Sequence, residues 1–535
     1  MAPLPLTQKD LEQLADKGIS AEQVMGQIHL LRNGAPYARL NRPCTIGDGI
    51  LNLTEPELKR HTVFYDQESP RRTIIKFVPA SGAATRMFEE LIQLELTDAF
   101  VEPDWIRAKA AKGDRASQTL LTVMRNLPHF AFYDELKKCS THEEINIGRL
   151  QKREHYLRVL RYLLHPVGLD YARLPKGLLL FHRYPEGART AFEEHLVEAA
   201  LYAKGKDDTC RLHFTVASGY MARFEALFNH VRRHYESEFG MHLEVHFSTQ
   251  KSSSDTVATD MNNKPFRLEN GRILFRPGGH GALIDNLNRL DGDIIFIKNI
   301  DNVVPDGRKP ATTRYKKALA GLLLSRQQET FQRLESLHGP SPSEQTLQEI
   351  AAFAGHHLGA TPPPEITRAS QETRRAWLFE RLNRPLRVCG MVRNEGEPGG
   401  GPFWVEGDDL SVSLQIVENA AVNPSASQQK ILKASTHFNP VDLVCATRDF
   451  KGKPFDLTRF VNPKSVFIAR KSKGERKLNA LELPGLWNGA MAHWNTLFVE
   501  VPKETFNPVK TITDLLRKEH LTARDAGAPC SHTAS

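Results

Sequence analysis

The sequence of 535 residues contains few features of a secreted, membrane or zinc-binding protein. Its six cysteines, at positions 44, 139, 210, 389, 445 and 530, form no CxxC pair, which excludes a zinc or redox centre built on that motif. No run of roughly 18 apolar residues occurs, and residues 1–14 lack a basic stretch followed by an apolar one. We therefore expect a cytoplasmic protein with reduced, mostly buried thiols.

Two families of catalytic motif are also missing. The sequence contains no HExxH segment and no GxSxG elbow, so it offers neither a standard zinc-protease helix nor the nucleophile turn of an α/β-hydrolase. His242 and His246 are four residues apart, but they alternate with apolar residues in a strand-like segment. We expect both imidazoles to face solvent instead of a metal ion.

The charge balance is mildly basic and its excess is dispersed. Lys and Arg number 71 against 63 Asp and Glu, and the one compact basic run covers residues 470–477, without interleaved aromatic residues. A groove for single-stranded nucleic acid would need such aromatic residues. The sequence therefore favours small anionic substrates over nucleic acid or a membrane as partners.

Two segments share a pattern of buried strand, tight loop and amphipathic helix. One begins at Thr73 with TIIKFVPASG, and the other at Leu212 with LHFTVASG. Residues 240–249 alternate apolar and polar residues, as a half-buried strand would, and residues 291–301 add a buried strand. This order predicts an α/β fold with a mixed, mostly parallel sheet flanked by helices.

The chain is long enough for a large core with additional modules. We expect an N-terminal helical appendage, an α/β core, a C-terminal segment that completes the active site, and a mobile tail. These parts are assigned to residues 1–70, 71–455, 456–520 and 521–535, with helical insertions in the core at about 88–170 and 312–385.

Small residues follow the first expected strand, where a backbone could approach a ligand closely. The turn runs from Pro79 to Arg86 and is followed by an expected helix, so free N–H groups, the helix dipole and the guanidinium could together bind phosphate. The turn matches neither a P-loop nor the GxGxxG fingerprint. The alternative is a tight turn that needs small residues only for packing.

Two further loops carry candidate ligands. Asp301 and Asn302 lie where the buried strand at 291–301 ends, and a carboxylate there could hold Mg²⁺ against phosphate oxygens or merely cap the next turn. Residues 275–287 place three glycines around His280, which would let the backbone approach a base or a phosphate. The glycines could also simply form a turn.

Taken in order, five segments resemble the UDP-sugar pyrophosphorylases, including the UDP-N-acetylglucosamine and UDP-glucose enzymes, which have a GT-A-like nucleotidyltransferase fold. They are SGAATRM (81–87), LPKGLLLFHRYPEGARTAFEEHL (174–196), RPGGHGAL (276–283), FIKNIDNV (296–303) and FNPVKTITDLL (506–516). The last is the most specific of the five. The whole chain also resembles a bacterial protein family of unknown function, which supplies no substrate.

The resemblance implies transfer of a nucleotidyl group, with UTP as the expected donor and a sugar 1-phosphate as the acceptor. It implies catalytic roles for Arg86, Lys176 and Lys510, and Mg²⁺ as a cofactor on Asp301. The implied nucleotide-binding residues are Ser81, Gly82, Ala83, Ala84, Thr85, Gln250, Gly278, Gly279, His280 and Gly281. The candidate sugar-binding residues are Asn302, Gly390, Glu397, Glu418 and Asn439.

One departure from the family pattern lies in the first loop. Ser81 and Ala84 stand where the pyrophosphorylases have glycines, and their added Cβ atoms could narrow the space for a triphosphate. A rival hypothesis is therefore a sugar-nucleotide sensor or scaffold that binds without transfer. Retention of Arg86, Lys176, Asp301 and Lys510 favours the enzyme, because a binder has less need of all four groups.

Overall fold

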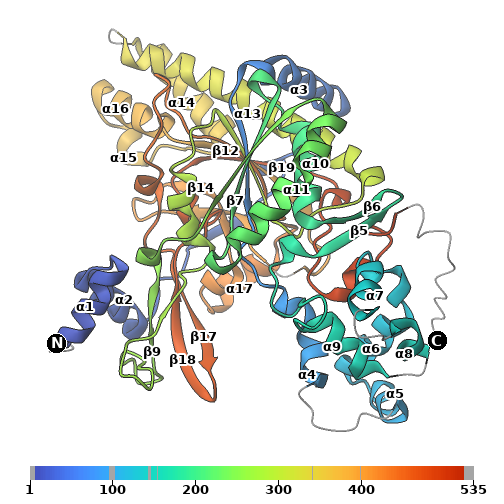
Figure 1. Ribbon diagram of the computed structural model, residues 1–535. Coiled ribbons are helices and arrows are strands. Elements are labelled where there is room, and N and C mark those ends of the chain that lie inside the picture. Colours follow the sequence, from blue (N-terminus) through green and yellow to red (C-terminus); the bar gives the residue numbers. More distant parts are fainter. Residues whose placement is uncertain are drawn as a thin grey trace.

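The computed structural model describes residues 6–95, 103–141, 146–152, 155–339, 342–397 and 399–522. A central sheet lies among helices, and two smaller lobes extend from it, one helical and one built around a long hairpin (Figure 1). Of the predicted mobile tail, residues 523–535 lie outside the described residues.

The described part of the central sheet has ten strands. All of them run parallel to their neighbours except β16, which is antiparallel to β11 and β12, and β15, which is antiparallel to β12. In spatial order the strands are β2 (Thr45–Ile46), β3 (Gly49–Leu51), β19 (Asn495–Glu500), β12 (Leu386–Arg393), β16 (Asp442–Ala446), β11 (Ile294–Lys298), β4 (Ile74–Pro79), β7 (Thr209–Thr215) and β8 (His242–Ser248), with β15 (His437–Phe438) beside β12. The predicted mixed, mostly parallel sheet is confirmed.

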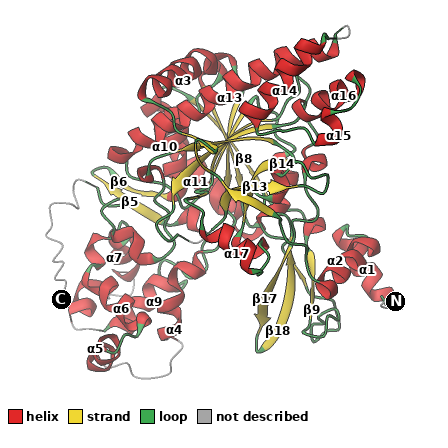
Figure 2. Ribbon diagram, turned by 180° about the vertical axis from the view of Figure 1, so that it is seen from behind, coloured by secondary structure: helices red, strands yellow, loops and turns green. Residues whose placement is uncertain are grey.

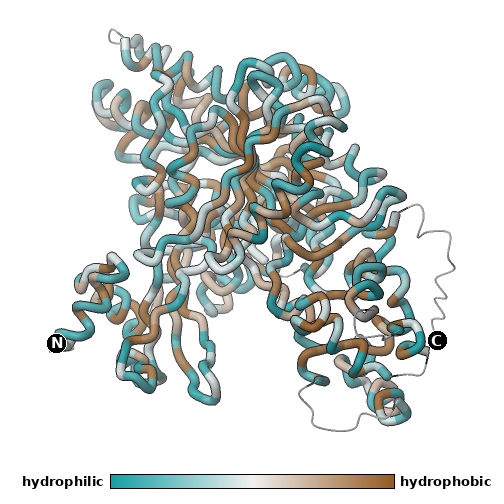
Figure 3. Tube along the Cα trace, in the orientation of Figure 1, coloured by the Kyte–Doolittle hydropathy of each residue, from teal (hydrophilic) through white to brown (hydrophobic). Residues whose placement is uncertain are grey.

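The sheet is buried on both faces because its central strands are mostly apolar. Successive side chains of a strand point to opposite faces, and β4 accordingly sends Ile74 into one core and Ile75 into the other. In β11, Phe296 packs into the same core as Ile74, and Ile297 packs into the same core as Ile75. The tube coloured by hydropathy shows this apolar centre under a polar exterior (Figure 3).

Helices cover the first of these faces. They are α3 (Glu55–Glu68), α10 (Ala191–Tyr202), α11 (Met221–Phe239) and α13 (Lys309–His338), followed by α14 (Glu344–Leu358), α15 (Pro364–Thr367) and α16 (Gln371–Leu382). α13 packs against β12 and β16 and lies along α3 (Figure 2). Part of the segment 312–385, predicted as an insertion, is thus a helix of the core. The opposite face is covered by α12 (Ile284–Leu287) and residues 486–494.

The helical lobe contains the helices between β4 and β7 that the sequence predicts. They are α4 (Glu89–Glu95), α5 (Pro103–Ala111), α6 (Arg115–Arg125), α7 (Tyr133–Thr141), α8 (Ile147–Lys152) and α9 (Tyr156–Leu164). A short hairpin of β5 (Leu180–Tyr184) and β6 (Gly187–Thr190) leads from this lobe to α10. The amphipathic α9 buries Val159, Leu160 and Leu163 in the main core.

The second lobe joins distant parts of the chain. It combines α1 (Gln8–Lys17), α2 (Ala21–Asn33), β9 (Thr256–Thr259), β10 (Phe275–Arg276), β17 (Phe467–Lys473) and β18 (Arg476–Glu482). Thr7 and Ser20 form capping boxes that start the two helices. The basic run 470–477 lies in the β17–β18 hairpin, which extends outward from the molecule (Figure 1).

The segment 1–70, predicted as a helical appendage, also contributes strands. β1 (Leu40–Pro43) joins a small sheet with β13 (Gly401–Glu406) and β14 (Val412–Val417), next to α17 (Ala426–Lys433). β3 pairs with β19 and so extends the central sheet. These strands are only two to four residues long, which is too short for a recognisable pattern, and their partners lie far away in the sequence.

The cysteines within the described residues are free thiols. Cys44, Cys210, Cys389 and Cys445 are buried and Cys139 is partly buried, whereas Cys530 lies outside the described residues. Burial raises the pKa of the Cys389 thiol to about 11. No helix within the described ranges has both the length and the apolarity to cross a membrane.

Candidate functional site

Four parallel strands end side by side at one edge of the central sheet. β4 pairs with β11 on one side and β7 on the other, and β7 pairs with β8. Backbone hydrogen bonds continue this order beyond the strands, from Ala80 N to Thr215 O and from Val216 N to Ser248 O, both 2.8 Å. The loops that follow these strands form one continuous carboxyl edge, the usual ligand position in an open α/β sheet.

The loop after β4 exposes backbone donors at this edge. Residues 81–83 are exposed and Ala84 is fully buried. Ala84 N donates to Leu174 O at 2.9 Å, and Lys176 N donates to Gly82 O at 3.2 Å. The amide of Ala84 is therefore engaged, whereas the amides of residues 81–83 donate to no acceptor within the described part of the chain.

The turn after this loop differs from the expected α-helix. A 3₁₀ segment, η2 (Ala84–Phe88), precedes α4, so the predicted helix N-terminus is a 3₁₀ turn. Thr85 Oγ1 donates to Ala172 O at 3.1 Å and helps to hold the turn. Arg86 is exposed and forms no hydrogen bond or ion pair among the described residues.

Three of the predicted residues meet beside this loop. Lys176 Nζ lies 2.8 Å from Asp301 Oδ2, and Lys510 Nζ lies 3.1 Å from the same oxygen. The Lys176 and Asp301 side chains are buried, with exposed fractions of 11% and 9%, but that of Lys510 is 59% exposed. We call Lys176, Asp301 and Lys510 the edge cluster. It carries a net positive charge and opens to solvent through Lys510.

Opposing effects determine the ionisation of Asp301. Burial would raise the pKa of its carboxyl group, but the ammonium groups of Lys510 and Lys176 outweigh burial and hold the pKa below its usual value. The carboxylate is therefore ionised at neutral pH. Its Oδ1 atom is buried and accepts no hydrogen bond among the described residues.

The C-terminal segment is anchored so that it presents Lys510. Val509 N donates to Asp301 O at 3.0 Å and Asn507 N donates to Asn302 Oδ1 at 2.9 Å. Lys176 Nζ also donates to Val509 O at 2.7 Å. The lysine of the PKG segment therefore holds both the carboxylate and the backbone next to the second lysine.

The local sequence explains the position of Lys176. Its neighbour Gly177 packs so closely that a Cβ atom would lie 2.8 Å from the Phe224 ring, which is under any normal contact distance. Pro175 precedes the short η4 turn (Lys176–Leu178), which ends before β5. The PKG segment thus fits a narrow space between α11 and the carboxyl edge of the central sheet.

The predicted base-binding residues come together near the end of β8. Gln250 Nε2 donates to Ser254 Oγ at 3.2 Å, and a Cβ atom at Gly278 would lie 2.6 Å from Ser254 O. Asn286 Nδ2 ties the glycine loop to β8 by donating to Ser248 Oγ at 2.8 Å. Gln250 and Gly278 are therefore neighbours through Ser254.

Packing accounts for the three glycines of the loop. A Cβ atom at Gly281 would lie 2.2 Å from Pro484 O, and Gly279 has a φ of +79°. His280 stacks on Trp487, with ring centroids 4.2 Å apart, and its Nδ1 accepts from Leu486 N at 3.0 Å. Burial lowers the pKa of His280 to about 4, so the imidazole is neutral and holds the loop against residues 484–487.

Three of the predicted sugar-binding residues have internal partners. Asn302 is 2% exposed and its amide binds the C-terminal segment. Gly390 lies inside β12, not in a loop, where a Cβ atom would approach Val501 at 3.1 Å. Asn439 Oδ1 accepts from Val441 N at 3.0 Å and fixes the turn before β16. These contacts show that all three residues have structural roles within the fold.

The two acidic candidates are more accessible. Glu397 forms an ion pair with Lys503 at 2.6 Å. Glu418 accepts from Asn488 Nδ2 at 3.1 Å, lines a pocket beside β14, and has its pKa raised by burial. Glu418 is therefore the candidate best placed to meet a ligand hydroxyl.

A second lysine–carboxylate cluster, not predicted from the sequence, lies inside the molecule. Lys76 Nζ and Lys298 Nζ lie 2.9 Å and 2.7 Å from the two carboxylate oxygens of Glu198. All three side chains are at most 1% exposed. We call them the buried cluster. The two lysines within the otherwise apolar runs of β4 and β11 were the sequence feature that could have revealed it.

A metal ion would find only one carboxylate at the edge cluster. The described residues contain no group of three or more His, Cys, Asp or Glu side chains that could hold a metal. Mg²⁺ commonly binds through one or two carboxylates and completes its shell with phosphate oxygens and water. Asp301 Oδ1, buried without a hydrogen bond, is the ligand atom that fits this role.

Comparison with protein-family models identifies the family of this chain. The model of the family described as Domain of unknown function (DUF4301) matches residues 7–521. The chain belongs to this family. The match spans every element of the edge cluster, so the cluster lies within the DUF4301 domain. Among curated proteins, none matches the chain.

Solved structures similar to this DUF4301 chain include three pyrophosphorylases or phosphorylases. The uridine diphosphate N-acetylglucosamine pyrophosphorylase of Trypanosoma brucei is 12% identical, with 96% of this chain and 79% of that chain covered and a TM-score of 0.46. The UDP-glucose phosphorylase of Trypanosoma brucei is 14% identical, with 95% of this chain and 77% of that chain covered and a TM-score of 0.42. The UDP-glucose pyrophosphorylase of Leishmania major is 12% identical, with 95% of this chain and 78% of that chain covered and a TM-score of 0.40. Likeness at this level identifies neither a substrate nor a reaction.

Proposed function

We propose that the protein transfers a nucleotidyl group from a nucleoside triphosphate, with UTP as the favoured donor, to a sugar 1-phosphate and releases pyrophosphate. The observation that carries this proposal is the edge cluster beside the free amides of residues 81–83. Two ammonium groups on one carboxylate leave a net positive charge at the carboxyl edge, which suits a polyphosphate.

In the proposed reaction, a phosphate oxygen of the sugar 1-phosphate attacks the α-phosphorus of the nucleotide. The new P–O bond forms as the bond to the β-phosphate bridging oxygen breaks, and that electron pair leaves with pyrophosphate. No covalent intermediate with the protein is required. Negative charge grows on the phosphoryl oxygens, and fixed cations stabilise it without reorganisation.

The proposed roles of the cationic residues differ with the exposure of their side chains. Lys176 is buried and held by Asp301 and Val509, so it supplies a fixed charge. Lys510 and Arg86 are exposed, so they can move toward the phosphates. Mg²⁺ on Asp301 Oδ1 would neutralise phosphate charge when bound. Gln250 and the glycine loop are the proposed base site, and Glu418 is the proposed contact for a sugar hydroxyl.

One observation favours the rival function of a sensor. Ala84 occupies a buried position and its amide is already bonded to Leu174 O, so this residue offers no donor to a triphosphate. A protein that lacked this donor could still bind a nucleotide sugar without transfer. The exposed amides of residues 81–83 and the edge cluster are the features that favour transfer.

The test is to incubate the purified protein with each nucleoside triphosphate, a panel of sugar 1-phosphates and Mg²⁺, and to measure pyrophosphate. We expect release with a uridine nucleotide, and no detectable release from Lys510→Ala. The control is Lys518→Ala, which removes an exposed lysine nearby in the chain and should leave turnover unchanged. Nucleotide-sugar binding without pyrophosphate release from any pair would support the sensor, and unchanged turnover in Lys510→Ala would remove that residue from the mechanism.

A further inference from the structure

A pocket of about 600 Å³ runs along β14; its lining includes Glu418, the proposed sugar contact, as well as Arg381 and Arg384, but no residue of the edge cluster. Its walls come from β13, β14, α16 and the segments 462–467 and 485–493. Arg384 comes just before β12, whereas Asp301 comes just after β11. Both strands are antiparallel to β16 and so run in the same direction. The arginine end of the pocket therefore lies at the amino edge of the sheet, opposite the edge cluster.

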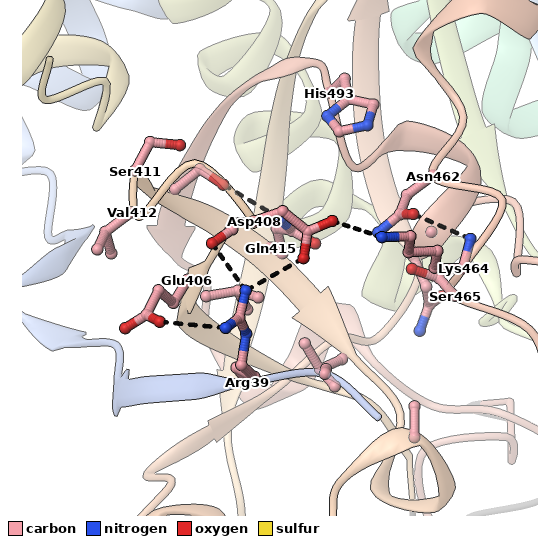
Figure 4. Close-up of a pocket in the computed structure, with 18 of the residues that line it drawn as sticks. Arg39, Glu406, Asp408, Ser411, Val412, Gln415, Asn462, Lys464, Ser465 and His493 are labelled. Atoms are coloured by element: carbon pink, nitrogen blue, oxygen red, sulfur yellow. Dashed lines mark hydrogen bonds and ion pairs between the residues drawn. The ribbon is translucent and has the colours of Figure 1, made fainter. Parts of the chain in front are cut away.

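The acidic residues on one side of this pocket already have cationic partners. Arg39 lies 3.7 Å from Glu406 and 3.1 Å from Asp408, and Lys464 lies 2.5 Å from Asp408. Figure 4 shows Arg39 and Lys464 approaching Asp408 from different sides, with His493 apart from these pairs. The charges on this side of the pocket are balanced within the protein.

The other side has two arginines without comparable partners. Arg381 forms no hydrogen bond or ion pair among the described residues. Arg384 is 19% exposed, and its nearest carboxylate is that of Glu380, which is 3.7 Å away and 81% exposed. Asp409, the nearby acid, accepts instead from Ser411 N and Oγ. The Arg384 guanidinium thus has one solvent-exposed ion pair and a hydrogen bond from Nε to Glu380 O at 3.1 Å, whereas the Arg381 guanidinium, which also lines the pocket, has no bonded partner in the described part of the chain.

The electrostatics of this side agree with an unbalanced positive charge. Burial, together with the charge of Arg384, outweighs the opposing charge of Asp409 and lowers the pKa of Arg381 to about 9. Burial and both arginines also lower the pKa of His493, so the imidazole is neutral and adds no charge of its own. An unpaired guanidinium in a partly buried place is costly, and an anion in the pocket would relieve that cost.

We propose that Arg381, Arg384 and His493 bind the phosphate group of a small organic phosphate. A phosphate dianion matches two guanidinium groups in charge and in its ability to accept paired hydrogen bonds. Trp377, Gln415 and Ser413 line the pocket beyond the arginines and provide apolar and polar contacts for the rest of the ligand. Phosphate binding by these residues needs no transfer at the edge cluster, although Glu418, the proposed sugar contact, lines the same pocket.

The test uses calorimetric titration with inorganic phosphate of the full chain carrying Lys510→Ala, so that binding at the edge cluster is weakened. We expect Arg381→Gln to reduce the phosphate affinity roughly tenfold or more, because it removes charge-assisted hydrogen bonds. The matched control is Arg368→Gln, which removes the same charge from an exposed arginine outside the pocket and should change the affinity less than twofold.

Two further arms make the outcome decisive. Acetate should bind far more weakly than phosphate, and equal binding would overturn the assignment of a phosphate. In phosphate-free buffer, Arg381→Gln should melt at a higher temperature than the parent, since an uncompensated charge is gone. If Arg381→Gln does not fold, Arg384→Gln in the same titration decides. Unchanged phosphate affinity in a folded variant, or an equal loss in Arg368→Gln, would overturn the proposal.

Discussion

The edge cluster and the buried cluster use the same chemistry in two environments. Each places two lysines on one carboxylate, and each includes a residue of β11 or of the loop that follows it. The buried cluster is at most 1% exposed, and Tyr202 OH also donates to Glu198 at 3.0 Å. In the edge cluster, Lys510 is 59% exposed and Asp301 Oδ1 has no hydrogen bond.

This difference shows that accessibility, and not the types of residue, separates a structural charge cluster from a candidate site. The buried lysines are already matched by internal acceptors, so they have no capacity left for a ligand. The edge lysines share one oxygen and face solvent on one side. Breaking each cluster should therefore affect different properties of the protein.

The largest effect on stability is expected from Glu198→Gln. The substitution removes the counterion of Lys298 and of Lys76, whose pKa burial already lowers to about 7, and breaking a buried ion pair in this way costs about 3–5 kcal/mol. The shift of the urea unfolding midpoint measures it. Glu344→Gln is the control, because Glu344 pairs with Arg374 at the surface and such pairs contribute only ~0–1 kcal/mol. Equal shifts in the two variants would contradict the distinction between the clusters.

The next effect is expected on catalysis, from Lys176→Met. Loss of one fixed cation that stabilises developing charge costs a transferase on the order of 10²–10³ in turnover, or about 3–4 kcal/mol of barrier. Pyrophosphate release measures this loss. The melting temperature should also fall, because Asp301 and Val509 O lose a partner, but by less than in the paired variant Lys298→Met, whose lysine is at most 1% exposed. A Lys176→Met protein that loses stability instead of turnover would place Lys176 with the structural lysines.

A smaller effect is expected at an ion pair of intermediate accessibility, Asp10 with Arg267. The Asp10 side chain is 2% exposed and that of Arg267 is 41% exposed. The hydrogen bond from Arg267 lowers the pKa of Asp10 to about 2. The pKa of Asp10 in the folded state is below its unfolded value of about 4. The ion pair therefore adds to the free energy of unfolding above pH ~4, and this contribution disappears as the pH falls toward 2.

Because solvent screens the exposed Arg267 side chain, the Asp10–Arg267 pair contributes only about 1 kcal/mol to the free energy of unfolding. Asp10→Asn should therefore lower the urea midpoint at pH 6 by a small amount and leave stability near pH 2 the same as in the parent. Urea unfolding at the two pH values checks the expectation. A difference between the proteins that persists at pH 2 would show that Asp10 acts through packing and not through its charge.

The sequence was sufficient to predict the elements whose patterns are long and local. The apolar runs of β4 and β11 and the alternating β8 were predicted as strands, because buried and half-buried strands differ in pattern. The strands between residues 40 and 51 were missed, because they are very short and form only by pairing with residues such as Phe498. No local pattern indicates a partner that distant.

For the candidate site, the resemblance brought together residues that local reasoning could not connect. Lys176, Asp301 and Lys510 are far apart in the sequence, and their meeting depends on strand order. Arg381 was not predicted at all, because an arginine near a helix end is usually solvated and its neighbours in the pocket come from β14 and residue 493. The roles of the individual residues remain predictions.

The position of β19 in the sheet has a consequence for how the protein is made. This strand, at residues 495–500, lies between β3 and β12, and Lys510 follows it. A ribosome therefore synthesises this interior strand, and then Lys510, only after both strands that flank it in the sheet. Until β19 is synthesised, the edges of β3 and β12 with which it pairs must be covered in another way, and a product interrupted before this strand lacks both an interior strand and one lysine of the edge cluster.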